Sequence, residues 1–210
     1  MNAIEEFEAI INAIYGVYLD STTGFREIRE RFEASQQNSL SLLKEKHPEL
    51  ATLEYLDQTL FIYGKGDPNS REAIWLHKCT QGQYKKRNSD DGLNFLFISN
   101  MALVSMYQFW EDHYRSAIAG LLGETKNSVS EPVMGDIRLL RHSIIHHAGI
   151  ALPEVDRCEV LTWFREGEMI FLDKAKFEFT VSQIKKMLQR HKERHERAQQ
   201  RLSPVETTHG

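Results

Sequence analysis

The chain has 210 residues, enough for one large domain or two small ones, and its formal net charge is −4. Hydrophobic residues make up 41% of it and charged residues 27%, as in an ordinary globular protein. No apolar run reaches the roughly 18 residues of a membrane span, and the chain starts with acidic residues where a signal peptide would be basic. The two cysteines, Cys79 and Cys158, are too few and too far apart for a disulfide scaffold or a zinc ribbon. We therefore expect a soluble cytoplasmic protein without a membrane partner.

The N-terminal part of the chain has the pattern of two amphipathic helices. Apolar residues recur every three or four positions from Ile4 to Tyr18, which predicts a helix that ends between residues 16 and 20. The hydroxyl side chains of residues 21–23 favour the start of a second helix, which should end before Pro48. Two helices joined by a short break are thus expected here.

The segment that follows is harder to assign from its pattern. Residues 53–63 fit a helix or a strand equally well, and residues 64–69 contain the glycines and proline of a loop. Residues 72–77 fit one or two helical turns. The pairing of residues 50–90 therefore stays open at this point.

Residues 92–122 are the most apolar segment, and apolar side chains cover most of a helix circumference there, as in a central helix. Pro132 suits the first turn of another helix, whose inward residues should be Val133, Ile137, Leu140, Ile144 and Ile145. That helix should end between residues 149 and 153.

The last part of the chain changes period. Residues 161–172 hold two apolar runs around a polar turn, which predict a short β-hairpin. A basic helix is expected over 181–201, followed by a disordered tail at 203–210. The predicted fold class is therefore mainly all-α, a single helical domain over 1–202 with a small β-hairpin near its C-terminus.

Two arginines and three histidines interrupt the apolar pattern of the helix that begins at Pro132. They lie in the run Arg138-Leu139-Leu140-Arg141-His142-Ser143-Ile144-Ile145-His146-His147. Arginine stays protonated and binds phosphate through two donors, while histidine titrates near neutral pH and can transfer protons. Together they supply what metal-independent RNA cleavage needs, a base for the 2′-hydroxyl and a cation for the developing charge on the phosphate oxygens. Such cleavage would leave 2′,3′-cyclic phosphate ends.

Arg141, four intervening residues and His146, with the polar His142 directly after the arginine, resemble the motif of the HEPN superfamily. In that family a long helix with an acidic residue precedes the motif helix, and Glu111 is the matching residue here. The resemblance covers about residues 90–150. It implies a helical bundle whose motif helices meet across a homodimer, so that two arginines and two histidines line one cleft.

The resemblance also implies roles for these residues in an endoribonuclease that uses no cofactor and no metal. Arg141 and His146 would be catalytic, His142 would orient or share a proton, and Glu111 would position the arginine. Residues five apart on a helix point about 140° away from each other, so Arg141 and His146 of one subunit do not share a face. A site formed by two subunits avoids this difficulty. His147 also meets a looser family spacing, so the catalytic histidine stays open between His146 and His147. The residues expected to bind RNA are Arg138, His147, Lys185, Lys186 and Arg190.

By the same resemblance the protein would serve as a prokaryotic toxin or defence-type RNase, with an antitoxin or regulatory protein as a further partner. Two other functions remain open: a non-catalytic HEPN module that binds nucleotide or RNA or mediates dimerisation, and a metal-dependent hydrolase built on His142, His146 and a carboxylate. Simpler explanations exist for single residues too. Glu111 could merely pair with Arg115 at helical spacing. Arg190 and His195 have the same spacing as the motif, but they lie on a charged, solvent-facing helix.

Overall fold

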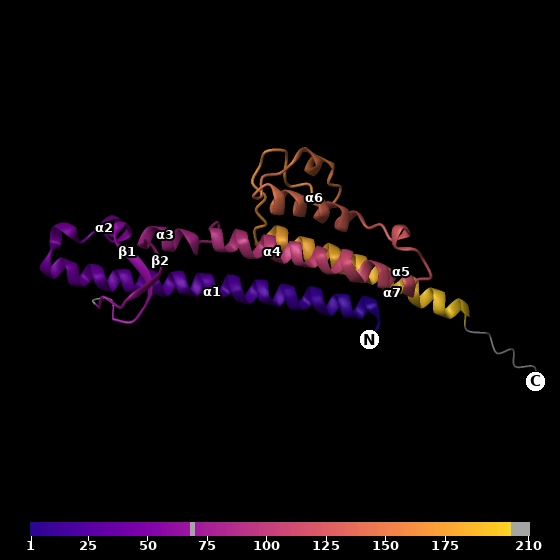
Figure 1. Ribbon diagram of the computed structural model, residues 1–210, viewed down its shortest axis with the longest axis horizontal. Coiled ribbons are helices and arrows are strands. Elements are labelled where there is room, and N and C mark those ends of the chain that lie inside the picture. The colour runs from indigo at the N-terminus through magenta and orange to yellow at the C-terminus, as the bar shows by residue number, and fades with distance from the viewer. Residues whose placement is uncertain (68–69, 203–210) are drawn as a thin grey trace, which may run out of the picture. The chain divides into compact units, whose positions relative to one another are not determined.

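The computed structural model describes residues 1–67 and 70–202, which are mainly helical with one two-stranded antiparallel sheet (Figure 1). The mainly all-α fold class predicted from the sequence is therefore confirmed. The predicted disordered tail at 203–210 lies outside the described residues. Within those residues, no helix combines the length and the apolar character needed to cross a membrane.

The chain divides into two compact units, which are described separately. One unit consists of Met1–Leu19 and the chain from Ile98 onward, and the other of Asp20–Phe97. Helices α1 (Ala3–Lys46) and α4 (Leu93–Phe109) contribute to both. The single domain predicted over 1–202 stays a prediction.

Helix α1 is continuous where the sequence pattern predicted a break. It runs from Ala3 to Lys46 without an end near residue 20, so the expected N-cap at residues 21–23 is wrong. Thr22 is 4% exposed and belongs to the buried stripe instead of capping a new helix. Each helical glycine, Gly16 and Gly24, costs about 1 kcal/mol relative to alanine, which the burial of residues on either side outweighs.

The unit formed by Asp20–Phe97 contains the sheet. After α1 its elements are a 3₁₀ turn (Pro48–Leu50), α2 (Leu53–Gln58), β1 (Leu60–Lys65), β2 (Ile74–Thr80), α3 (Gln81–Arg87) and the start of α4. The two strands pair antiparallel from Leu60 opposite Thr80 to Lys65 opposite Ile74, with an irregularity after Tyr63. The ambiguous segment 53–63 is thus a helix followed by a strand. The helical turns predicted for 72–77 are wrong, because this apolar run pairs with β1.

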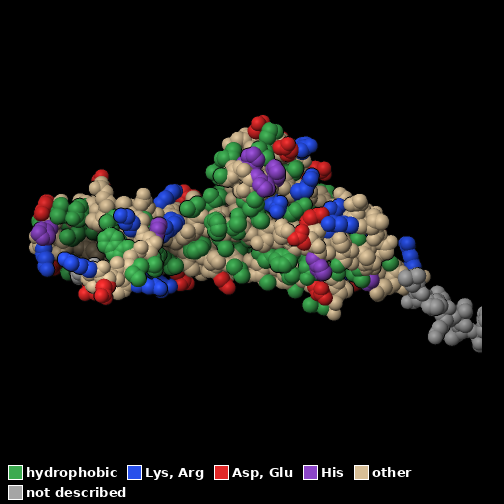
Figure 2. Space-filling view, viewed as in Figure 1, with side chains coloured by type: hydrophobic (Ala, Val, Ile, Leu, Met, Phe, Trp, Pro, Cys, Tyr) green, Lys and Arg blue, Asp and Glu red, His purple; other side chains and the backbone are tan. Residues whose placement is uncertain are grey.

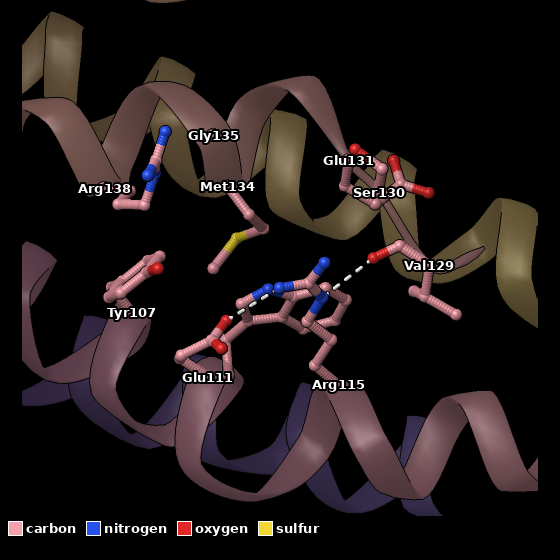
Figure 3. Close-up of a pocket in the computed structure, with 10 residues that line it drawn as sticks. Tyr107, Glu111, Arg115, Val129, Ser130, Glu131, Met134, Gly135 and Arg138 are labelled. Carbon is pink, nitrogen blue, oxygen red and sulfur yellow. Dashed lines mark hydrogen bonds and ion pairs between the residues drawn. The ribbon is translucent and has the colours of Figure 1, made fainter. Parts of the chain in front are cut away.

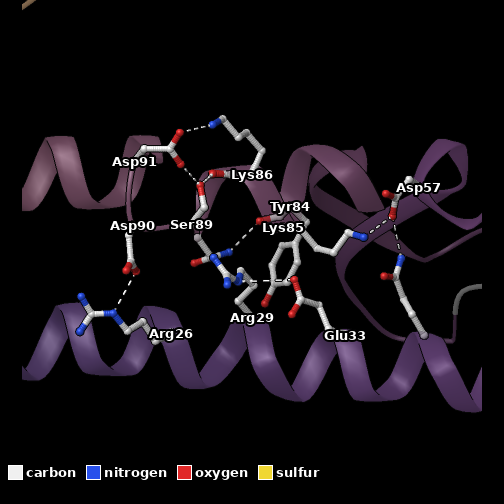
Figure 4. A network of polar contacts seen from close by, with 12 residues as sticks. Arg26, Arg29, Glu33, Asp57, Tyr84, Lys85, Lys86, Ser89, Asp90 and Asp91 are labelled. Carbon is white, nitrogen blue, oxygen red and sulfur yellow. Dashed lines mark hydrogen bonds and ion pairs between the residues drawn. The ribbon is translucent and has the colours of Figure 1, made fainter. Parts of the chain in front are cut away.

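Aromatic rings and ion pairs hold this unit together. The ring of Tyr84 lies 4.2 Å from that of Phe61 and 4.7 Å from that of Phe32, which joins α3, β1 and α1. A polar network runs alongside, in which Lys85 pairs with Asp57 at 2.7 Å (Figure 4). These contacts use both an apolar and a charged layer to fix α3 against α1 and α2.

The other unit holds the candidate site. Beyond the N-terminal half of α1 and most of α4, its elements are a π-helical turn η2 (Trp110–Tyr114), α5 (Arg115–Leu121), a 3₁₀ turn (Lys126–Ser128), α6 (Pro132–His146), a 3₁₀ turn η4 (Pro153–Arg157) and α7 (Lys174–Leu202). Phe7 of α1, Leu103 of α4, Ile137 of α6 and Ile184 of α7 are all fully buried in one core. The long helix predicted over 92–122 is confirmed in extent, but its turn at residues 110–114 is π-helical.

The β-hairpin predicted over 161–172 is wrong. Residues 160–173 form turns and irregular backbone, with one isolated bridge between Ile150 and Met169. The backbone N–H groups at the start of this segment are bound to the carboxylate of Asp136 on α6, at 2.6 Å for Val160 and 2.8 Å for Leu161. These N–H groups therefore cannot form the backbone hydrogen bonds of a hairpin. Four apolar side chains of the segment are buried without one: Leu161, Phe164, Ile170 and Leu172.

Candidate functional site

Helix α6 carries the arginine and histidine run and orients it. It begins at Pro132 as predicted, and Val133, Ile137, Leu140 and Ile144 are buried. Ile145, which was expected to face inward, is 44% exposed, because it lies on the flank away from the core. The opposite face presents Arg138, His142 and His146, which are spaced four residues apart and exposed.

The three histidines cluster on the surface at the end of α6. The ring centroid of His142 lies 4.9 Å from that of His146 and 5.9 Å from that of His147. Figure 2 shows histidine side chains gathered over α6, with Lys and Arg side chains beside them. His147 is the C-cap of α6 and has left the helical conformation, which keeps its ring near His142. Both His146 and His147 thus remain candidates for the motif histidine.

Arg141 points toward α4 and away from His146. Its Nη2 lies 3.2 Å from Oε1 of Gln108, and its guanidinium carbon lies 5.8 Å from the ring centroid of Tyr107. Its Nε is buried and has no hydrogen-bond partner among residues 1–67 and 70–202. Its Nη1 makes no hydrogen bond with those residues either, so the guanidinium retains donor capacity for an anion.

Arg138 of α6 lines three hollows on the surface. Their volumes are about 370, 350 and 210 Å³. The second brings together the predicted site residues Glu111, Arg138, Arg141 and His142, while His146 and His147 lie outside it. Arg138 makes no hydrogen bond or ion pair with any described residue, so its charge is available to a ligand.

Glu111 pairs with two cations, one of which is Arg115, the simpler of the two partners considered from the sequence. Its carboxylate pairs with Arg115 at 3.1 Å and with Lys126 at 2.8 Å, and within the described chain it makes no direct contact with Arg141. Burial raises the pKa of Glu111, but hydrogen bonds from Lys126 and Arg115 outweigh burial and hold the pKa below its ordinary value. The simpler explanation, pairing with Arg115, describes the geometry. The role in positioning Arg141 stays a prediction.

The basic residues of α7 lie apart from these hollows. Lys185 lies over the ring of Tyr15, with its Nζ 6.0 Å from the ring centroid, and Lys186 is exposed. Arg190 pairs with Glu131 at 2.7 Å. None of the three lines the hollows, although Glu131 lines the largest one. Their contribution to RNA binding stays a prediction.

Sequence reasoning missed several residues that shape the site. Tyr107 lines two hollows, and burial followed by the charge of Glu111 raises the pKa of its phenol, which therefore stays a donor. Arg157 lines the third hollow together with His142. Ser143 Oγ accepts a hydrogen bond from Leu152 N at 3.1 Å and holds the loop that leads to Arg157. No spacing in the sequence signals these contacts, because they join different elements.

No family model, no curated protein and no solved structure matches the chain. Nor does the part of the chain that the structure describes contain three or more His, Cys, Asp or Glu side chains arranged to hold a metal ion. The assignment of chemistry therefore depends on the residues of α6 and the hollows beside them.

The residue after the histidine cluster is conformationally strained. Ala148 has φ of +52°, in the left-handed region that favours glycine. We expect Ala148→Gly to raise the free energy of unfolding by about 0.5 to 1 kcal/mol, because relief of strain exceeds the added entropy of the unfolded chain. Urea denaturation measures this. Ala148→Val should destabilise the protein. If Ala148→Gly were less stable than the wild type, residue 148 would not be strained.

Proposed function

We propose that the protein is a metal-independent endoribonuclease that acts as a homodimer, with Arg141 and His146 as its catalytic residues. The observation that carries this proposal is the convergence of Arg138, Arg141 and His142 on one hollow, with the ring of His146 only 4.9 Å from that of His142. Guanidinium groups thus lie beside imidazole rings on one face of α6, and these are the types of group that can bind phosphate and transfer protons.

The reaction requires only groups that this chain supplies. A neutral histidine takes the proton of an RNA 2′-hydroxyl, and the 2′-oxygen then forms a bond to the neighbouring phosphorus. Arg141, assisted by Arg138, stabilises the negative charge that grows on the non-bridging oxygens. The bond from phosphorus to the 5′-oxygen breaks, and a protonated histidine donates a proton to that leaving oxygen. The products carry a 2′,3′-cyclic phosphate and a 5′-hydroxyl.

The geometry of α6 favours a site completed by a second copy of the chain. Arg141 lines a hollow that His146 does not reach, since the two side chains leave the helix in different directions. A second α6 packed against the first would bring its own histidines to this hollow. Ile145 and Phe109, each 44% exposed, lie near these residues in the sequence and offer apolar area for such packing.

A role as a toxin or defence RNase in the cytoplasm of a prokaryote is part of this proposal and follows from the family resemblance alone. An antitoxin or regulatory protein would then restrain the enzyme. Ala148 stands two residues after His146, where some toxins of the superfamily carry a tyrosine that the antitoxin modifies, so restraint here would take another form.

The proposal is tested by incubating the purified protein with a mixed RNA pool in EDTA and assaying the fragment ends. We expect cleavage that leaves 2′,3′-cyclic phosphates, and a loss of about 10²-fold or more in Arg141→Ala and in His146→Ala. Arg197→Ala and His195→Ala on α7 are matched controls and should retain full activity.

Three outcomes would contradict the proposal. No cleavage by the wild type would favour the non-catalytic module. Cleavage that appears only after metal is added would favour the hydrolase built on His142 and His146. Equal cleavage by all variants would show that Arg141 and His146 do not carry the activity, and would likewise favour the non-catalytic module.

A further inference from the structure

The largest of the three hollows lies between the π-helical turn η2 and the first turns of α6. It has a volume of about 370 Å³, within the range of small-molecule sites. Figure 3 shows Glu111 and Arg115 pointing from η2 and α5 toward α6, and Met134 of α6 pointing toward them. Buried Trp110 and Tyr107 complete its walls. The cavity thus combines apolar surfaces with a small number of charged groups.

Gly135 lines this cavity without adding a side chain to it. It lies in the interior of α6, where glycine costs about 0.5 to 1 kcal/mol relative to alanine. A Cβ atom built on Gly135 would meet no other heavy atom within 4 Å, so no packing contact requires glycine there. Because Gly135 lines the cavity, the effect of lacking a side chain is to leave space for a ligand.

Arg115 and Glu111 place a donor beside an acceptor in the cavity. Arg115 donates from Nε to the carbonyl oxygen of Val129 at 2.9 Å and from Nη1 to Glu111 at 3.1 Å (Figure 3). Its Nη2 has no hydrogen-bond partner among the described residues. The lowered pKa of Glu111 keeps its carboxylate ionised and able to accept further hydrogen bonds. The pair is therefore anchored by hydrogen bonds within the chain, with Lys126 on the other oxygen of Glu111, while Nη2 of Arg115 has a donor left for a ligand.

We propose that this cavity binds a guanine base of the RNA strand and so selects the cleavage site, an inference that rests on the proposed function. Guanine presents its O6 and N7 acceptors side by side, which match the donors of an arginine. Its N1–H lies next to O6 and can donate to the carboxylate of Glu111. Adenine and cytosine carry an amino group where guanine has O6, and uracil lacks the N7 acceptor.

Arg138 links the base pocket to the cleavage site. It lines both this cavity and the hollow that contains Arg141 and His142. In this proposal the phosphodiester of a guanine bound to Arg115 lies beside Arg138, the residue common to both hollows. Cleavage would then occur next to guanine.

The test measures binding of GMP, AMP, CMP and UMP to the full-length protein by calorimetry in EDTA. We expect GMP to bind about tenfold or more tightly than AMP, the discrimination of one bidentate arginine contact. Gly135→Leu, which fills the cavity, should weaken GMP binding about tenfold or more, whereas Gly135→Ala should change it less than about twofold. Gly120→Leu, at an exposed helical glycine with open space around it, is the matched control and should bind normally.

A second variant keeps the test decisive if Gly135→Leu does not fold, as judged by thermal unfolding. Glu111→Gln preserves the shape of the side chain and should reduce the preference for GMP over AMP. Equal binding of all four nucleotides, or GMP binding that neither variant alters, would overturn the guanine pocket. Cleavage in EDTA without GMP binding would overturn the pocket and leave the RNase. GMP binding without cleavage would overturn the RNase and leave the pocket.

Discussion

Asp136→Ala is expected to lower the free energy of unfolding by about 3 to 5 kcal/mol, because it removes the acceptor of a buried set of backbone hydrogen bonds. Asp136 is 3% exposed and accepts from the backbone N–H groups of Glu159, Val160 and Leu161. Without the carboxylate these donors would be left unpaired, and the turns over 160–173 would lose their anchor to α6. Equilibrium denaturation in urea measures the loss.

The same carboxylate holds the segment that closes one side of the site. Residues 152–157, which include Arg157 beside His142, lead directly into the anchored turn. Asp156→Ala is the matched control, since Asp156 is exposed and accepts a single bond from Glu166 N at 3.1 Å; its loss should cost under about 1 kcal/mol. If the free energy of unfolding of Asp136→Ala were within about 1 kcal/mol of the wild-type value, the turns would not need the carboxylate.

Mixing two inactive variants should restore RNA cleavage. If Arg141 of one subunit acts with His146 of the other, a dimer of Arg141→Ala with His146→Ala retains one intact site. Random exchange makes half of the dimers mixed, so activity should rise from under about 1% to about a quarter of the wild-type value. Cleavage of a labelled RNA after the two proteins are unfolded and refolded together measures this.

Two controls accompany the mixing experiment. Each variant refolded alone should stay inactive, and the double variant Arg141→Ala/His146→Ala mixed with wild type should give no activity above that of the wild-type subunits. Failure of the two single variants to complement each other, with mixed dimers detected by mass spectrometry, would show that each subunit carries its own complete site.

The sequence pattern correctly predicted those features of the fold that depend mainly on residues close together in the chain. The start of α6 at Pro132 and the burial of Ile137, Leu140 and Ile144 follow from helical spacing and from the suitability of proline for a first turn. The continuity of α1 could not be predicted, since Thr22 caps a helix in isolation but is buried by tertiary packing. The absence of a hairpin over 161–172 could not be predicted either, since it depends on Asp136, which lies more than twenty residues from the backbone groups it binds.

Some features of the candidate site could likewise be predicted from the sequence, whereas others depend on contacts between distant elements. Helical spacing alone predicted that Arg141 and His146 point away from each other, and Arg141 does line a hollow that His146 does not. The partners of Glu111 depended on Lys126, which comes from a loop fifteen residues later. Gln108 and Tyr107 meet Arg141 only because α4 and α6 pack together. The roles of these residues in RNA cleavage remain predictions.

The cavity that contains Arg115 depends on the π-helical turn η2, because this turn sets the direction in which Arg115 leaves the helix. A π-helical turn accommodates one residue more than an α-helical turn, so the helix after it is rotated by about 100° relative to an uninterrupted α-helix. Arg115, the first residue of α5, follows the turn immediately. Removing one residue from η2 would restore a regular helix and carry Arg115 around its axis, away from Val129. A single codon gained or lost at this turn would thus be enough to create or abolish the pocket, without any change in the residues that line it.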